Sequence, residues 1–189
     1  MAQASSTISG QKTFKSAITI GATCTFTSAT KKITASGTSL SDLQVRDLIT
    51  ITGSASNNST FTISEVDANG TFVIVEEDVT SETVAADTVL TYVGFVTAKV
   101  KGDGYYSQTD GLHTVAYHVD ATCTGALKMQ GSLSTTPTED DFFDIDGTTF
   151  TTDQSTTINS VNFTGNFVWV RAKLTANTAG SVTKILFNN

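Results

Sequence analysis

The side chains that could perform chemistry are few, and none of them forms a known catalytic or metal-binding pattern. His113 and His118 are five residues apart in an alternating apolar stretch, so they should point to opposite faces of a strand. They cannot bind one metal from that strand, and neither Asp120 nor Cys123 completes a zinc-ligand spacing. The chain has no G-x-S-x-G nucleophile elbow, no GxGxxG and no P-loop. We therefore expect a protein that is not an enzyme and needs no cofactor.

One acidic segment could hold a cation. Five carboxylates fall within eight residues: Glu139, Asp140, Asp141, Asp144 and Asp146. Ca²⁺ takes several oxygen ligands, so the four aspartates are weak calcium candidates, although the segment does not match an EF-hand loop. A solvated acidic loop is the preferred interpretation. Paired carboxylates also serve glycosidases, but Phe142 and Phe143 are equally well explained as anchors of the loop as walls of a sugar cleft.

Composition and charge exclude several classes of partner. The chain has 189 residues and a formal net charge of -7, and Lys and Arg are not clustered, so nucleic acid is not expected as a direct partner. No apolar run approaches the ~20 residues of a membrane span, and the N-terminal residues include no apolar signal segment. Cys24 and Cys123 are about a hundred residues apart, and we expect two buried thiols, not a disulfide.

The elements that would position these residues are short strands. Threonine and other β-branched residues are abundant, proline occurs once, and Gly, Asn and Asp punctuate the apolar alternation. We expect an all-β protein with two small antiparallel domains. Its parts are an extended arm, a barrel-like or sandwich-like module, a linker and a β-sandwich, over residues 1–16, 17–93, 94–104 and 105–189.

The stretch from Ile49 to Asp78 is typical of the first module. Alternation predicts a strand over Leu48–Thr52, a second strand in "STFTISEV" and a third in "TFVIV". The intervening Asn69-Gly70 suits the positive φ of a primed hairpin turn. The stretch contains no His, no Cys and no cation, so we expect it to form structural core and not a functional site.

Four aromatic residues are candidates for a protein interface. In "NFVWVRAKLT" the Val, Ala and Leu positions should face the core, which leaves Trp169 beside Arg171 on the other face, partly exposed. Tyr105 and Tyr106 follow a Gly-Asp-Gly break, and Phe14 belongs to the arm. The same Tyr105, Tyr106 and Trp169 could instead form a stacking platform for sugars.

Two parts of the chain resemble proteins of tailed-bacteriophage virions. Phe26 to Val93 resembles a β module with a Thr-rich strand, an Asp before an "ITITGS" strand, an Asn-rich loop, a "TFT" strand, a Gly turn and an apolar strand ending in acidic residues. The matching residues are Asp47, Ile49, Ile51, Gly53, Asn57, Asn58, Phe61, Val66, Gly70, Val75 and Glu76. "DGYYSQTDGLHTVAYHV" and "GNFVWVRAKLTANTAGSVTKI" are similar to a β-sandwich of virion structural and neck proteins of cyanophages.

The resemblance implies a non-enzymatic structural protein of the virion, assembled in the host cytoplasm. The expected role is that of a capsid decoration or cement protein, which binds the major capsid protein or other virion proteins and forms a homo-oligomer, with a trimer as one option. A neck, tail or fibre component and a glycan-binding adhesin module are the alternatives. The resemblance brings no catalytic residues with it.

Overall fold

The computed structural model describes residues 6–84, 87–106 and 111–188, and the chain is all-β, as the sequence predicts. It divides into two compact units. We call Lys15–Phe95 the inserted unit, because the other, the split unit, combines the residues before it with those from Val96 onward. No helix within the described ranges is long and apolar enough to cross a membrane.

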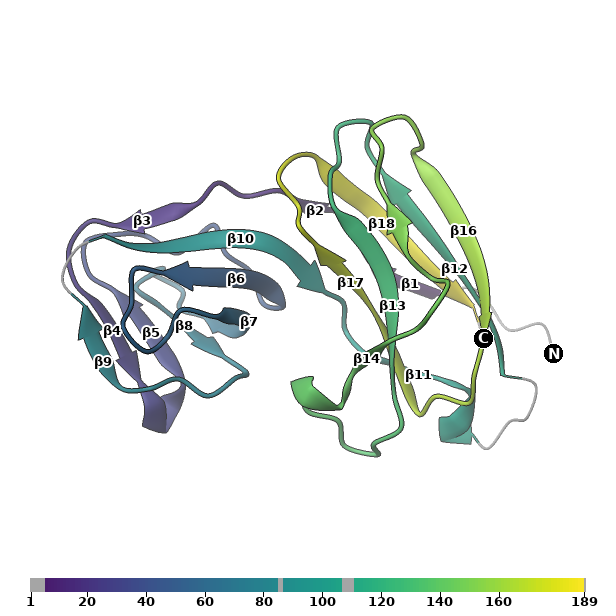
Figure 1. Ribbon diagram of the computed structural model, residues 1–189, viewed down its shortest axis with the longest axis horizontal. Helices are drawn as coiled ribbons and strands as arrows, with labels where there is room; N and C mark the ends of the chain where they lie inside the picture. The colour runs from purple at the N-terminus through teal and green to yellow at the C-terminus, as the bar shows by residue number, and fades with distance from the viewer. Residues whose placement is uncertain (1–5, 85–86, 107–110, 189) are drawn as a thin grey trace. The chain divides into compact units, whose positions relative to one another are not determined.

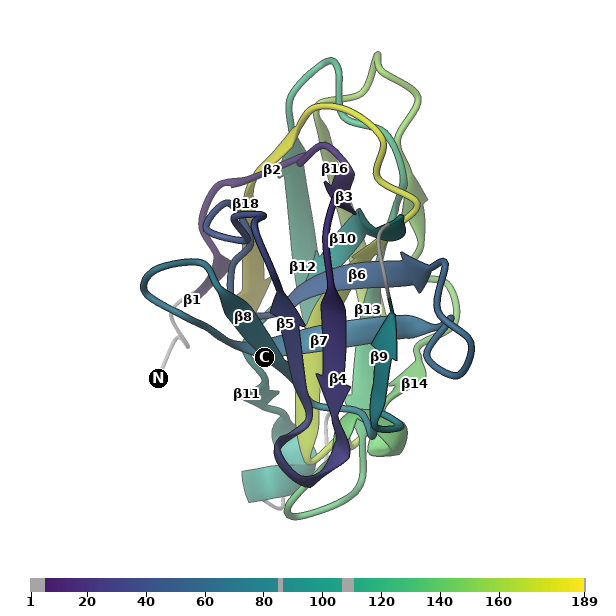
Figure 2. The same cartoon turned by 90° about the vertical axis from the view of Figure 1, so that its left-hand side faces the viewer.

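The inserted unit is one antiparallel ladder in the order β3–β10–β6–β7–β8–β5–β4–β9 (Figure 1). Figure 2 shows β4, β5, β8 and β9 side by side. The strands are β3 (Ile18–Ile20), β4 (Cys24–Thr27), β5 (Lys32–Ala35), β6 (Asp47–Thr52), β7 (Thr60–Val66), β8 (Phe72–Val75), β9 (Glu82–Val84) and β10 (Thr88–Val96), with a 3-10 turn η1 (Ser28–Thr30). Among the described residues the ladder does not close into a barrel, because β3 and β9 remain its two ends.

One core fills this unit, and alternation places its side chains. Ile49 and Ile51 of β6 are fully buried in the same cluster as Val73 and Val75 of β8. β7 pairs with β6 over residues 60–62 and with β8 from Ile63 onward, and its pairing with β8 shifts register between Ile63 and Glu65. Both halves of the ladder therefore contribute to the same core, as in a sandwich.

The turn between β7 and β8 differs from the primed hairpin that the sequence predicts. Gly70 has a positive φ of 66°, but Asn69 does not. The Gly70 N–H donates to the carbonyl of Asp67 at 2.8 Å, and the Asp67 carboxylate accepts hydrogen bonds from the backbone and hydroxyl of Thr71. The longer turn is stabilised by Asp67, so only the glycine must adopt the left-handed conformation.

The split unit contains two antiparallel sheets, β1–β18–β12–β16 with β2 on β18, and β14–β13–β17 with β15 on β13 and β11 on β17. Its elements are β1 (Ser6–Ser9), β2 (Lys12–Thr13), β11 (Val100–Lys101), η2 (Asp103–Tyr106), β12 (Leu112–Val119), β13 (Ala126–Ser132), η3 (Glu139–Asp141), β14 (Phe143–Asp144), β15 (Phe150–Thr151), β16 (Ile158–Thr164), β17 (Trp169–Thr175) and β18 (Ser181–Asn188).

The buried faces of these two sheets make the second core. Val115, Tyr117 and Val119 of β12 are buried, as their alternation predicts, and so are Val170, Ala172 and Leu174 of β17. The Tyr117 ring stacks on Phe150, and its hydroxyl donates to the Thr148 carbonyl at 3.0 Å, which satisfies its one buried polar atom. Cys24 and Cys123 are free, buried thiols in different units, and burial raises the pKa of each to about 11.

The predicted arm and the predicted linker are both folded. Within the arm, Ser6–Ser9 and Lys12–Thr13 pair with β18 at the edge of a sheet, and Ile8 is buried. Residues 1–5 of the arm lie outside the described residues. Residues 94–104 contain the end of β10, all of β11 and the start of η2. Polar segments can join a sheet through backbone hydrogen bonds alone, so their composition did not reveal this pairing.

A buried ion pair joins Lys15, the first residue of the inserted unit, to Asp47 of β6. Lys15 Nζ contacts Asp47 Oδ2, and the two side chains are 14% and 0% exposed. The same carboxylate oxygen accepts the Gln44 N–H at 2.8 Å, and the Lys15 ammonium lies 4.9 Å from the centre of the Tyr92 ring. Removing one member of such a pair leaves a charge in a place where water cannot solvate it.

We expect Asp47→Ala to lower the free energy of unfolding by about 3–5 kcal/mol, because Lys15 then keeps an uncompensated charge. Urea unfolding at pH 7 measures the change. The paired apolar replacement Lys15→Met with Asp47→Leu should cost much less, and Glu65→Ala, at an exposed position of β7, should stay within about 0.5 kcal/mol of the parent. An Asp47→Ala protein as stable as the Glu65→Ala control would contradict this role.

A second carboxylate organises the Asn-rich loop. The Glu82 side chain accepts hydrogen bonds from the backbone N–H groups of Ala55 (2.6 Å) and Ser56 (3.0 Å), and from the side chains of Ser54 and Asn57. These bonds, led by the one from Ala55, lower the pKa of Glu82. The loop is thus closed around an anion that β9 supplies.

The lowered pKa gives Glu82→Gln a defined pH signature. A carboxylate whose pKa is lower in the folded state stabilises the protein above its ordinary pKa, about 4.3, and that stabilisation is lost as pH falls through the folded value. The difference in unfolding free energy between parent and Glu82→Gln should therefore be largest at pH 7 and shrink below about pH 4. A difference that does not change with pH would contradict the assignment, and Glu65→Gln serves as the control.

Candidate functional site

Three of the four aromatic residues predicted for an interface come together in the split unit. The ring centres of Tyr105 and Trp169 are 5.4 Å apart, and those of Tyr105 and Tyr106 are 5.3 Å apart. Tyr105 and Tyr106 are 44% and 52% exposed, and Trp169 is half-buried. Phe14 is not part of this group: its N–H donates to the Gly180 carbonyl, beyond the opposite end of β17 from Trp169.

Two lysines, which the sequence reasoning did not single out, complete the group. Lys101 Nζ lies 4.0 Å from the centre of the Tyr105 ring and 5.7 Å from that of Tyr106. Lys99 Nζ lies 5.3 Å from the centre of the Trp169 ring. Cation–π attraction holds both ammonium groups beside the rings. We call Lys99, Lys101, Tyr105, Tyr106 and Trp169 the aromatic–lysine cluster.

The cluster is positioned by a segment that follows β17 closely. Thr97 N–H donates to the Ala172 carbonyl at 2.9 Å, and Ala172 N–H donates to Thr97 Oγ1 at 3.0 Å. β11 then pairs with β17 so that Lys101 lies opposite Trp169. Residues directly opposite each other in an antiparallel pair share a face, which places the lysine and the indole together.

Two glycines place the tyrosines beside Trp169. Gly102 N–H donates to the Val168 carbonyl at 3.0 Å, and Gly104 N–H donates to the Phe167 carbonyl at 2.9 Å. A Cβ at Gly102 would lie 2.5 Å from the Phe167 oxygen, and one at Gly104 would lie 2.5 Å from the Asn166 oxygen. Only glycine permits this approach of two backbones. The Gly-Asp-Gly interpreted as a domain break is therefore a docking element, and η2 presents Tyr105 and Tyr106 from it.

The loop after β13 closes the other side of the cluster. Trp169 Nε1 donates to the Thr135 carbonyl at 3.2 Å, and Lys99 Nζ donates to the Pro137 carbonyl at 3.3 Å. These bonds satisfy the indole N–H and fix the ring plane while one side of the group stays open to solvent. The result is an exposed set of aromatic side chains with few free rotamers.

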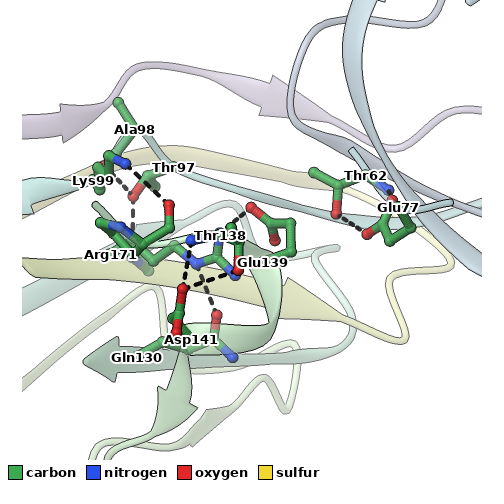
Figure 3. A network of polar contacts seen from close by, with 12 residues as sticks. Thr62, Glu77, Thr97, Ala98, Lys99, Gln130, Thr138, Glu139, Asp141 and Arg171 are labelled. Atoms are coloured by element: carbon green, nitrogen blue, oxygen red, sulfur yellow. Dashed lines mark hydrogen bonds and ion pairs between the residues drawn. The ribbon is translucent and has the colours of Figure 1, made fainter. Parts of the chain in front are cut away.

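The acidic segment finds its counter-ions within the chain and does not gather around a metal. Glu139 accepts a hydrogen bond from the Arg171 guanidinium at 2.6 Å, and Asp144 pairs with Lys128 (Figure 3 shows the Arg171 contacts). The Asp141 carboxylate instead accepts the Thr138 N–H at 2.7 Å, as in a capping box on η3, and it also accepts the Thr138 hydroxyl at 2.9 Å. Within the described ranges, no three His, Cys, Asp or Glu side chains are arranged to hold a metal ion.

The four aspartates considered as calcium ligands therefore make different contacts. Asp140 and Asp146 are exposed on the loop, while Asp141 caps and Asp144 binds Lys128 and Gln130. Hydrogen bonds from the Thr138 backbone and hydroxyl lower the pKa of Asp141. Burial alone would raise the pKa of Asp144, but the bonds from Lys128 and Gln130 outweigh it and lower that pKa.

Arg171 is the centre of this part of the sheet. Its side chain is almost completely buried, its Nε donates to Gln130 at 2.9 Å, and its guanidinium lies 3.8 Å from the centre of the Phe142 ring. Phe142 thus anchors the acidic loop, which is one of the two explanations that the sequence left open, whereas Phe143 is 45% exposed.

Figure 3 also shows a separate contact in the inserted unit, where Glu77 accepts hydrogen bonds from the backbone N–H (2.7 Å) and the hydroxyl (2.8 Å) of Thr62.

The two histidines lie on opposite faces of β12. His113 is fully buried, with its Nε2 at 2.9 Å from the Gly165 carbonyl and its ring stacked on Phe187. His118 is on the other face, and burial followed by the charge of Lys184 lowers its pKa. Since they share no face, they cannot act together as an acid–base pair or as ligands of one metal.

No known family model matches the chain. No curated protein matches its sequence significantly either.

Replacing Gly104 should disturb the cluster without touching its side chains. We expect Gly104→Ala to move η2, to separate Tyr105 from Trp169, and to destabilise the protein by about 1–3 kcal/mol, as overpacking does. Trp169 is the only tryptophan, so its fluorescence spectrum reports the change directly. Gly10→Ala is the matched control, because a Cβ there meets nothing within 4 Å. Unchanged Trp169 emission in Gly104→Ala would show that the glycine is not needed for the cluster.

Proposed function

We propose that the protein is a non-enzymatic structural protein of a tailed-phage virion, a capsid decoration or cement protein that binds the major capsid protein through the aromatic–lysine cluster. The observation that most strongly supports a protein-binding role is the cluster itself: exposed Tyr105 and Tyr106 beside Trp169, held by backbone docking and cation–π contacts. The resemblance of both halves of the chain to virion β modules supplies the setting.

The chemistry of the cluster suits a protein surface. Tyrosine and tryptophan dominate the energetics of protein interfaces, since each buries a large area at little cost in conformational entropy. The Lys99 and Lys101 ammonium groups add positive charge to a chain whose net charge is -7. A partner that offers carboxylates around an apolar depression would complement both features. On a symmetric shell, many such contacts add up even when each one is weak.

A sugar-binding role has less support from the geometry. Sugars stack on flat, accessible ring faces, but these rings meet edge to face, at interplanar angles of 62° and 72°. Ammonium groups also lie over the rings of Tyr105 and Trp169. A neck, tail or fibre component would use the same surface as a decoration protein, so the cluster does not distinguish among these virion positions.

Binding to capsid shells that lack the protein tests the proposal. We expect Tyr106→Ala and Trp169→Ala each to weaken binding by about 30-fold, the effect of losing a hot spot of about 2 kcal/mol. Lys101→Glu should weaken binding as well, and more strongly at low salt, because it reverses a charge at the interface. Sedimentation of fluorescently labelled protein with the shells measures all three.

Leu112→Ala is the control, since Leu112 is 53% exposed in the same unit but outside the cluster. It should bind within about twofold of the parent, in line with the small effect of most exposed substitutions. Circular dichroism and the melting temperature establish that each variant is folded. If folded Tyr106→Ala and Trp169→Ala bind like the parent, the cluster is not the attachment surface. Binding of the parent to a glycan array, lost in Trp169→Ala, would favour the adhesin alternative instead.

A further inference from the structure

The strand β16 forms one border of the five-stranded sheet of the split unit. It pairs with β12 over all seven residues, from Ile158 opposite His118 to Thr164 opposite Leu112, with no shift in register. On its other side, no strand of the described chain pairs with it. A regular edge of this length offers a row of backbone N–H and C=O groups to another strand.

The other border strands of the described chain each have a feature that hinders such pairing. Natural sheets protect their edges with short strands, charges, proline or bulges. β1 has a register shift between Thr7 and Ser9, β9 has three residues and includes Glu82, and β3 has three residues. The four remaining border elements, β2, β11, β14 and β15, have two residues each.

β16 has none of these protections. Its sequence, Ile-Asn-Ser-Val-Asn-Phe-Thr, contains no charge and no proline. Ile158 is 58% exposed, and Val161, although it points toward the core, is only half-buried. This contrasts with Val115, which lies opposite Val161 on β12 and is fully buried. The inner face of β16 is thus incompletely covered, as expected of a strand that lacks a neighbour.

We propose that β16 pairs with β16 of a second copy of this chain, antiparallel and centred on Val161. In this register Val161 meets the same residue of the other copy, Ile158 meets Thr164, and Ser160 meets Asn162. Both pairs point outward. Ile158 and Thr164 form a contact between β-branched side chains, and Ser160 and Asn162 pair a hydroxyl with an amide. The two sheets become one continuous sheet across a twofold axis, and the interface is self-complementary.

The absence of charge on β16 makes this strand compatible with a second copy of the same acidic chain. Two chains of net charge -7 repel each other, so they can meet most easily at a surface that contributes no charge of its own. β16 is such a surface. Antiparallel pairing about Val161 also needs no other segment of either chain, because each copy supplies the same seven residues. The virion resemblance implies a homo-oligomer with a trimer as one option, whereas this proposal is a twofold dimer. It does not depend on the proposed attachment through the aromatic–lysine cluster.

Sedimentation equilibrium of the full chain, with paired charge variants, tests the proposal. The parent should form a concentration-dependent dimer. S160K/N162K places lysines opposite each other twice across the axis, and should weaken the dimer at least about tenfold. S160D/N162K puts opposite charges in the same two places and should restore it. Thr183→Lys is the matched control, on an exposed position of β18, a strand that is paired on both sides.

Circular dichroism and melting temperatures confirm that the variants are folded. A dimer that is lost in S160K/N162K, regained in S160D/N162K and kept in Thr183→Lys supports the proposal. A parent that stays monomeric up to millimolar concentration overturns it. So does a trimer, or a dimer that S160K/N162K leaves unchanged.

Discussion

The contact of the Gly102–Gly104 backbone with that of Phe167 and Val168 is the constraint on which the candidate surface depends. The Phe167 ring is itself fixed, because it fills space beside Gly131, where a Cβ would lie 2.5 Å from it. The packed Phe167 ring therefore holds its own backbone in place, and that backbone accepts the Gly104 N–H at the start of η2. The backbone that carries Tyr105 and Tyr106 is consequently fixed while their rings stay exposed, so less conformational entropy is lost when they bind a partner.

The carboxylates of the acidic loop in the split unit are paired with cations of the same unit. The acidic loop faces the basic strands β13 and β17, so that Glu139 binds Arg171 and Asp144 binds Lys128. In the inserted unit, Glu82 fills the Asn-rich loop in the same manner. Carboxylates that already have protein donors are poor candidates for metal ligands, since a metal would have to displace those donors. The acidity that suggested calcium in the sequence has a structural explanation.

Alternation was enough to predict the longer strands of each unit and their buried faces, such as Ile49 and Ile51 in β6 or Val115 and Tyr117 in β12. It could not reveal which strands pair. β1 and β2 join β18 through backbone hydrogen bonds, which leave almost no mark on side-chain composition. The ion pair of Glu139 with Arg171 joins residues 32 positions apart, and no local pattern encodes it. For the cluster, the sequence does contain a usable signal, namely two lysines spaced by one residue just before Gly-Asp-Gly-Tyr-Tyr.

In the proposed role, many copies of the protein bind equivalent places of a capsid through the same exposed surface. The number of copies per particle therefore distinguishes a decoration protein from a neck or tail protein. A decoration protein occupies every equivalent place of the shell, whereas a neck or tail protein occupies a single ring. Quantitative mass spectrometry of purified virions, with the major capsid protein as internal reference, measures the ratio directly. The account predicts a copy number in constant proportion to the major capsid protein, in the hundreds per particle. Absence from purified virions, or only a few copies per particle, would contradict it.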